Sequence, residues 1–189
     1  MRDLSLHLMD IIQNSISACA SKLNVTIKTV PVSNQLFITV SDNGSGIESE
    51  LLKSITDPFT TTRQTRKVGL GIPLFKATAE RSGGYLEISS EIGVGTSLTA
   101  VFKIDNIDRP PLGDIAETIV NILTANPDIE LNMVLDNGTN ESFILRTDEL
   151  KNRLGGVPIN EYEVLEWIRG FIEDNIKITF GGVLNEVNG

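Results

Sequence analysis

The order of helical and strand patterns is the feature of this sequence that most constrains its fold. Apolar residues at helical spacing mark residues 3–20 and 71–82, and two alternating stretches rich in β-branched residues follow each of them. The predicted strands are residues 24–30, 35–41, 85–90 and 96–104, and a short helix is predicted at 48–54. Such an order favours helices packed on one face of a mainly antiparallel sheet. We therefore predict an α+β fold, an α/β sandwich built on a mixed, mainly antiparallel sheet.

A second, smaller part follows the last of these strands. Residues 108–111 (Asp-Arg-Pro-Pro) stop the strand pattern, because proline cannot donate a hydrogen bond to a sheet ladder. The patterns beyond them predict a helix at 115–123, a hairpin of 131–135 and 142–146 around Asn137-Gly138, and a helix at 162–172 with Trp167 in the core. We predict one domain over residues 1–107 and a small α+β extension over 108–189, in which no motif indicates a chemistry.

Composition excludes several classes of protein. The formal net charge of −9 and the isoelectric point near 4.6 argue against nucleic acid and acidic membranes as partners. The amino terminus carries acids at Asp3 and Asp10, unlike a signal peptide, and no stretch reaches the roughly 18 apolar residues of a membrane span. Cys19 is the only cysteine, and its helical spacing from Ile12 and Ile16 predicts a buried thiol. We expect a cytoplasmic protein with no nucleic-acid and no membrane partner.

A short acidic and glycine-rich motif directly follows the second predicted strand. It consists of Asp42, Gly44, Gly46 and Ile47 in the sequence DNGSGI. A buried carboxylate at this point can accept a hydrogen bond from a donor such as the exocyclic amine of adenine, and the glycines let the backbone approach a flat ligand closely. The motif alone is also compatible with an ordinary turn.

Two further patterns suit a phosphate group and its counterion. The sequence Gly69-Leu70-Gly71 joins a loop to a helix, so free backbone N–H groups can bind phosphates there, although flexible glycines at a helix entry are the simpler alternative. On the first helix, Asn14 shares a polar stripe with His7 and Asp10. Its amide oxygen can complete the oxygen shell of a magnesium ion that bridges phosphates.

Together and in this order, the motifs resemble those of the GHKL family, which includes DNA gyrase, heat-shock chaperones, histidine kinases and mismatch-repair ATPases. Residues 10–18 resemble the N box, and residues 42–47 resemble the first glycine box. Residues 57–63 (DPFTTTR) are similar to the segment that opens the ATP lid in many sensor histidine kinases. Residues 69–72 resemble the second glycine box, and residues 93–96 resemble the closing Gly-Thr element. The resemblance covers about residues 3–105.

The resemblance implies that the protein binds ATP and Mg2+. According to this resemblance, Asn14 would hold the metal, Asp42 would bind the adenine amine, and Thr96 would support the base. The other residues that it implies in the nucleotide site are Gly44, Gly46, Ile47, Thr61, Thr62, Arg63, Lys67, Gly69, Leu70 and Gly71. The lid is implied at about residues 60–68, and its basic residues can neutralise phosphate charge, although a solvated loop surface is the alternative.

The class of reaction stays open at this point. Asp10 stands where family members that hydrolyse ATP usually carry Glu, and its shorter side chain makes it a doubtful catalytic base. The lid sequence favours the kinases, so we expect transfer of the γ-phosphate to a partner protein in signalling. His7, the only histidine, is a weak candidate for the acceptor. The alternatives are a weak ATP hydrolase and a nucleotide-gated binding module, with the extension as partner surface or homodimer interface.

Overall fold

The computed structural model describes residues 3–55, 70–139 and 142–184. The helices are α1 (Leu4–Ser17), α2 (Ser49–Ile55), α3 (Gly71–Arg81), α4 (Ile115–Ala125), α5 (Thr147–Leu154) and α6 (Tyr162–Phe180). The strands are β1 (Lys22–Val30), β2 (Gln35–Asp42), β3 (Tyr85–Glu91), β4 (Gly95–Lys103), β5 (Glu130–Asp136) and β6 (Ser142–Arg146), and a 3-10 turn, η1 (Pro31–Ser33), joins β1 to β2.

The strands form a single six-stranded sheet in the order β3-β4-β2-β1-β5-β6. The pairs β1–β2, β2–β4, β3–β4 and β5–β6 are antiparallel, and β1–β5 is parallel. The three predicted hairpins and the prediction of a mixed, mainly antiparallel sheet are therefore confirmed. Burial alternates along β1, where Val25 and Ile27 are fully buried and their neighbours are not, as expected for a sheet with one covered face.

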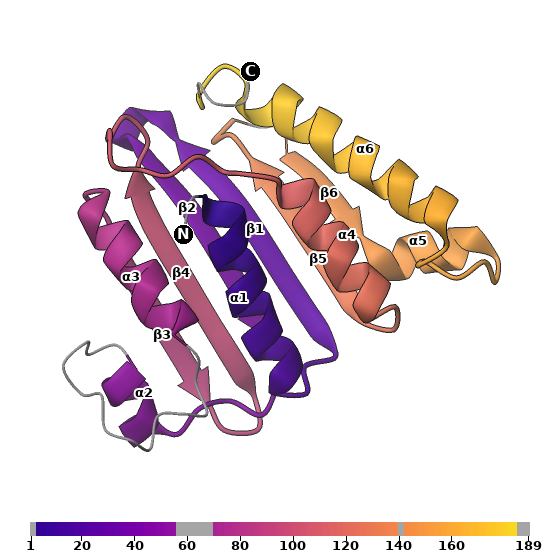
Figure 1. Cartoon of the computed structure of the whole chain (residues 1–189), viewed down its shortest axis with the longest axis horizontal. Helices are drawn as coiled ribbons and strands as arrows, with labels where there is room; N and C mark the ends of the chain where they lie inside the picture. Colours follow the sequence, from indigo (N-terminus) through magenta and orange to yellow (C-terminus); the bar gives the residue numbers. More distant parts are fainter. Residues whose placement is uncertain (1–2, 56–69, 140–141, 185–189) are drawn as a thin grey trace.

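The helices cover one face of this sheet, and Figure 1 shows α3, α1 and α4 beside one another on it. Helix α1 directs Leu4, Leu8 and Ile12, all fully buried, into the core. Helix α6 packs against α4, β5 and β6 at the far side of the molecule. The buried apolar side chains of all these elements form one continuous cluster.

The sheet and the core continue across residues 107 and 108, where we predict a domain boundary. Strand β5 extends the sheet from β1, and the chain between β4 and α4 crosses the start of α1. There the Leu4 amide donates to the Pro111 carbonyl over 2.9 Å, and Gly113, at φ 72°, lies so close to Asp3 that a Cβ on it would meet the Asp3 carboxyl carbon at 2.5 Å. The boundary stays a prediction, and its two sides share one sheet.

Two local expectations about burial were wrong, and one helix was missed. Helix α1 ends at Ser17, so Cys19 leaves the helical spacing, adopts a φ of 59° and is exposed instead of buried. Trp167 is 53% exposed, so it is not a core residue of the extension. Helix α5 was not predicted, because its apolar residues are too few for an amphipathic pattern. Within the described residues, no helix is long and apolar enough to cross a membrane.

Candidate functional site

A cavity of about 620 Å³ lies between α1, the start of α3 and the sheet. Its floor is made by three cross-strand neighbours, Val40, Leu98 and Ile88, from β2, β4 and β3. Its other apolar lining residues are Ile11, Ala18, Ile47, Leu51 and Ile72, and its polar ones are Asn14, Ser15, Ser17, Asp42, Ser45, Gly46, Glu48 and Thr96. The cavity thus combines apolar walls with a small set of polar groups, as small-molecule sites do.

Asp42 is the most firmly held polar side chain of the cavity. Its Oδ2 accepts a 2.6 Å hydrogen bond from the hydroxyl of Ser15 on α1. Its Oδ1 accepts from the Gly44 amide at 2.9 Å and from the Thr96 amide at 3.3 Å. Donors from three separate segments therefore orient the carboxylate. Oδ1 accepts two of these bonds, and Oδ2, which accepts one, keeps a lone pair for a further donor in the cavity.

The loop after Asp42 needs glycine for close backbone approach. Gly46 has a φ of 72°, and a Cβ on it would lie 2.1 Å from the carbonyl oxygen of Glu91. A Cβ on Gly44 would lie 2.8 Å from the carbonyl oxygen of Ala18. Between them, the Ser45 amide donates to Ala18 at 2.8 Å, so the loop is fixed to the end of α1. Close backbone contact was the predicted reason for these glycines, and the short distances to both carbonyl oxygens leave no room for a Cβ.

Thr96 belongs to a hydroxyl network at the start of β4. The Ser90 hydroxyl donates to the Gly95 carbonyl at 2.9 Å, so it accepts from the Thr96 hydroxyl at 2.8 Å. Ser90 also accepts from the Ile47 amide at 2.8 Å. This one serine therefore joins β3, β4 and the glycine loop, and it fixes the positions of Ile47 and Thr96 at the cavity.

Asp10 and Asn14 lie one turn apart on α1, but only Asn14 lines the cavity. Asp10 is exposed and lies beside the first residue of α3, where a Cβ on Gly71 would be 3.0 Å from the Asp10 Cβ. Leu70, just before α3, is 73% exposed. The structure thus brings Asp10 to the start of α3, next to the end of the cavity that Asn14 lines.

His7, predicted to share a polar stripe with Asp10 and Asn14, lies instead in the interface between α1 and α3. It is 1% exposed, and its ring stacks on Phe75 with a centroid distance of 4.9 Å. The Thr78 hydroxyl donates to Leu74, so it accepts from Nε2 of His7 at 3.1 Å, and Nδ1 has no partner among the described residues. Burial lowers the pKa of His7 to about 4, so the ring is neutral near pH 7.

The structure brings together five of the predicted site residues at the cavity, namely Asn14, Asp42, Gly46, Ile47 and Thr96. Gly44 lies behind Asp42, and Asp10, Leu70 and Gly71 lie at or near the start of α3. The remaining predicted residues, Thr61, Thr62, Arg63, Lys67 and Gly69, lie outside the described residues.

Sequence reasoning missed two hydroxyl groups and the apolar walls. Ser15 is adjacent to Asn14, but nothing local indicates that it pairs with a carboxylate 27 residues away. Ser90 gives no signal in an alternating strand. The apolar floor was open to prediction, because strand alternation places Val40, Ile88 and Leu98 on the helix-covered face.

The lining of the cavity fits an adenine nucleotide by its apolar residues and by its polar groups. Its apolar walls suit a flat base, and the carboxylate of Asp42 suits an amine donor. A magnesium ion has less protein support, because Asn14 is a single amide and the described residues contain no group of three or more His, Cys, Asp or Glu that could hold a metal. A cation beside Asn14 would need most of its oxygen ligands from phosphates and water.

Solved structures with a similar fold include the MutL ATPase domain of Aquifex aeolicus complexed with ADP. Its TM-score is 0.50 at 19% identity, and the match covers 82% of this chain and 68% of that one. The N-terminal domain of a DNA repair protein matches with a TM-score of 0.53 at 16% identity, over 77% of this chain and 53% of that one. At these identities the likeness shows a shared fold alone.

Proteins of similar sequence include a sensor protein and a sporulation kinase from bacteria. A putative sensor protein of Shewanella frigidimarina (strain NCIMB 400) is 33% identical over 103 residues, which cover 53% of this chain and 16% of that protein. Sporulation kinase C of Bacillus subtilis (strain 168) is 34% identical over 96 residues, which cover 51% of this chain and 22% of that protein. The chain therefore matches less than a quarter of the length of either relative.

The family match covers the part of the chain that forms the cavity. Residues 2–106 match the family described as histidine kinase-, DNA gyrase B-, and HSP90-like ATPases. This range contains α1 and α3, the four strands β1 to β4 and every residue that lines the cavity. The resemblance inferred from the motifs is confirmed, and the chain belongs to the histidine kinase-, DNA gyrase B- and HSP90-like ATPase family.

Proposed function

We propose that this protein binds ATP with Mg2+ in the cavity and transfers the γ-phosphate to a side chain of a partner protein. The observation that carries the proposal is the Asp42 carboxylate, held by Ser15 and the Gly44 amide at the side of an apolar cavity. A group fixed in this way can select a base with an exocyclic amine, because a ligand without that donor would cover the free lone pair of Oδ2 without forming a hydrogen bond to it.

Residues at the other end of the cavity would hold the phosphates. Asn14 offers an amide oxygen to Mg2+, and the start of α3 offers backbone N–H groups at Gly71. When bound, the metal would supply charge neutralisation between the phosphate groups. The lid residues Arg63 and Lys67 are proposed to add positive charge to the same phosphates.

The acceptor is proposed to belong to a partner, and His7 is an unsuitable acceptor. Its ring is buried between α1 and α3, and its Nε2 forms a hydrogen bond with the hydroxyl of Thr78. A phosphoryl acceptor must reach the γ-phosphate in line with the leaving oxygen, which a side chain packed on Phe75 cannot do. The relatives include a sporulation kinase and a sensor protein, which supports the proposal that the phosphate transfer serves signalling.

Hydrolysis is the second candidate function, and the position of Asp10 favours it. The Asp10 carboxylate is exposed beside Gly71, one helical turn before Asn14, so it lies at the phosphate end of the proposed site. An aspartate there can orient a water molecule if the γ-phosphate comes within hydrogen-bond reach. The third alternative is a nucleotide-gated binding module, in which ATP is bound and not consumed.

A time course with Mg-ATP labelled on the γ-phosphate separates these functions. Label on protein, either this chain or an added partner, would support the kinase, and free phosphate that disappears with Asp10→Asn would support the hydrolase. Label that stays on tightly bound ATP would support the binding module. The Asn14→Ala variant should lose magnesium-dependent binding, whereas Asn121→Ala, which changes an exposed asparagine of α4, should not. Absence of ATP binding by the unmodified protein would refute the proposal.

A further inference from the structure

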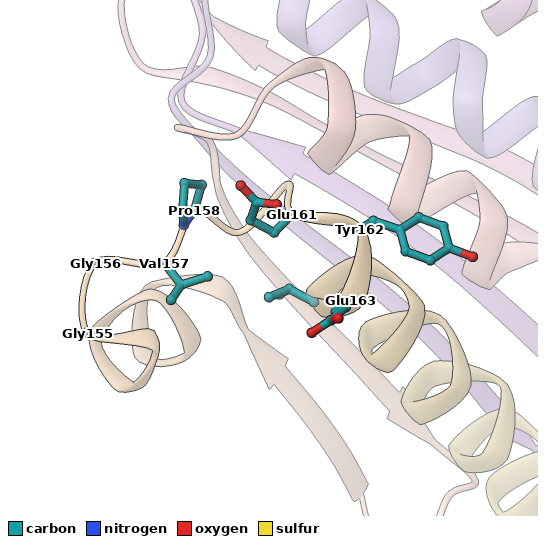
Figure 2. Close-up of a pocket in the computed structure, with 8 residues that line it drawn as sticks. Gly155, Gly156, Val157, Pro158, Glu161, Tyr162 and Glu163 are labelled. Carbon is teal, nitrogen blue, oxygen red and sulfur yellow. The ribbon is translucent and has the colours of Figure 1, made fainter.

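A second hollow lies in the extension, separate from the nucleotide cavity. It measures about 790 Å³ and lies between residues 155–158 and the start of α6 (Figure 2). An adjoining cavity of about 280 Å³ lies between α5 and α6, over Leu150, Leu154 and Trp167. Glu163 and Val164 line both cavities, so the two are adjacent, and we call them together the α5–α6 groove.

Trp167 lines the groove and belongs to a cluster of three aromatic rings beside it. Trp167 is 53% exposed and stacks on Phe171, which is 38% exposed, at a centroid distance of 4.8 Å. Phe143 of β6 meets Phe171 edge to face at 5.1 Å. Phe143 packs against the core, whereas Trp167 and Phe171 are open to solvent. Exposed apolar side chains grouped in this way are typical of protein interaction surfaces.

The charges of the groove have one sign. Glu161 and Glu163 are the charged side chains that line it, both are exposed, and neither carboxylate has a salt-bridge partner among the described residues. Glu161 is the N-cap of α6, but its side chain makes no capping hydrogen bond. Figure 2 shows both carboxylates on the side of α6 that faces residues 155–158, whereas the ring of Tyr162 points away. Their orientation is therefore not explained by a contact inside the protein.

We propose that the α5–α6 groove binds a segment of a partner protein that carries apolar anchor side chains flanked by lysine or arginine. The apolar anchors would occupy the space over Leu150, Leu154 and Trp167, and the basic side chains would pair with Glu161 and Glu163. Charge complementarity selects this partner over a second copy of the chain, whose net charge of −9 would bring further acids to an acidic rim. The proposal does not depend on nucleotide binding or on phosphoryl transfer.

The test is a display screen of random peptides of about 12 residues, enough to span such a groove, against the whole chain without nucleotide. Enriched peptides should combine large apolar residues with Lys or Arg. Because Trp167 is the only tryptophan, binding of a tryptophan-free peptide should shift the emission of this one residue. Enrichment without basic residues, no enrichment, or saturating binding with unchanged emission would each overturn the proposal.

Variants of exposed residues supply the controls. The double change Glu161→Lys with Glu163→Lys should weaken binding about tenfold, and Trp167→Ala about 30-fold in an assay with labelled peptide. Glu166→Lys reverses an exposed charge of α6 that lines neither cavity, so it should leave affinity within about twofold. Thermal melts check that all variants fold. Equal effects of the double variant and Glu166→Lys, or a dimer that Trp167→Ala dissociates, would refute the proposed partner.

Discussion

Replacement of His7 by glutamine should remove a defined part of the pH dependence of stability. Glutamine is close to histidine in volume, does not titrate, and can donate to Thr78 as Nε2 of His7 does. The folded protein keeps the imidazole neutral down to a pKa of about 4, whereas the unfolded chain takes up a proton near 6.5. A low pH therefore favours the unfolded state. The contribution of the neutral ring to the free energy of unfolding is fully present above pH 6.5, and it is lost as the pH falls toward 4.

The size of the effect follows from these two pKa values. Between pH 8 and pH 5, the difference in proton binding lowers the free energy of unfolding by about 2 kcal/mol, and the limit below pH 4 is about 3.4 kcal/mol. Paired carboxylates also weaken the fold in acid, so the unmodified protein alone cannot isolate this contribution. The difference in free energy of unfolding between the unmodified protein and the His7→Gln variant isolates the contribution of His7, because every carboxylate is common to both proteins.

Urea titrations of both proteins at pH 8, 7, 6 and 5 measure this difference. The unmodified protein should lose about 2 kcal/mol more than the variant over that range, with most of the change below pH 6.5. Thr78→Val serves as a control. It removes the acceptor of the Nε2–H bond but keeps the titrating ring, so the pH dependence of stability should remain. A difference between the unmodified protein and His7→Gln that stays constant from pH 8 to pH 5 would refute the assignment of a buried neutral imidazole.

Three further substitutions test the site and the extension. Ser15→Ala removes the hydroxyl donor to the cavity carboxylate and should weaken ATP binding about tenfold by calorimetry, while Thr124→Ala, whose hydroxyl bonds its own helix α4 and does not line the cavity, should change it little. Gly46→Ala places a Cβ against a carbonyl of β3 and should cost about 3 kcal/mol or more, whereas Gly93→Ala, at a similar φ in open space, should cost about 1 kcal/mol in urea unfolding. Thr147→Val removes two buried hydrogen bonds at the start of β5 and should cost about 2 kcal/mol, and a loss below about 0.5 kcal/mol would refute its structural role.

The sequence predicted the fold where local patterns and long-range packing agree. Alternation along β1 to β4 and helical spacing in α1 and α3 follow directly from one-sided burial, so these elements were predicted within a few residues of their bounds. The parallel pairing of β5 with β1 was not foreseen. It joins segments about a hundred residues apart, and neither strand carries a local signal for its partner.

The candidate site shows the same division between local and distant information. The reasons for Gly44 and Gly46 were predictable, since a glycine at a strand end implies close backbone approach. The hydroxyl groups of Ser15 and Ser90 were not, because a serine has no pattern of its own and takes its role from partners elsewhere in the chain. Cys19 was misplaced for a related reason: helical spacing continued in the sequence after the backbone had left the helix.

Contacts with α3, with the chain before α4 and with the glycine loop hold α1 in place, and this determines how the site can respond to a nucleotide. His7 packs on Phe75 of α3, and the Leu4 amide donates to the Pro111 carbonyl, which holds the first turn of the helix. The last turn is fixed through the Ser45 amide, which belongs to the glycine loop. A shift of α1 would break several buried contacts at once, at a cost of several kcal/mol by the usual size of such losses. The α1 wall that carries Asn14 is therefore preformed, and a conformational response to ATP has to come from elements other than α1.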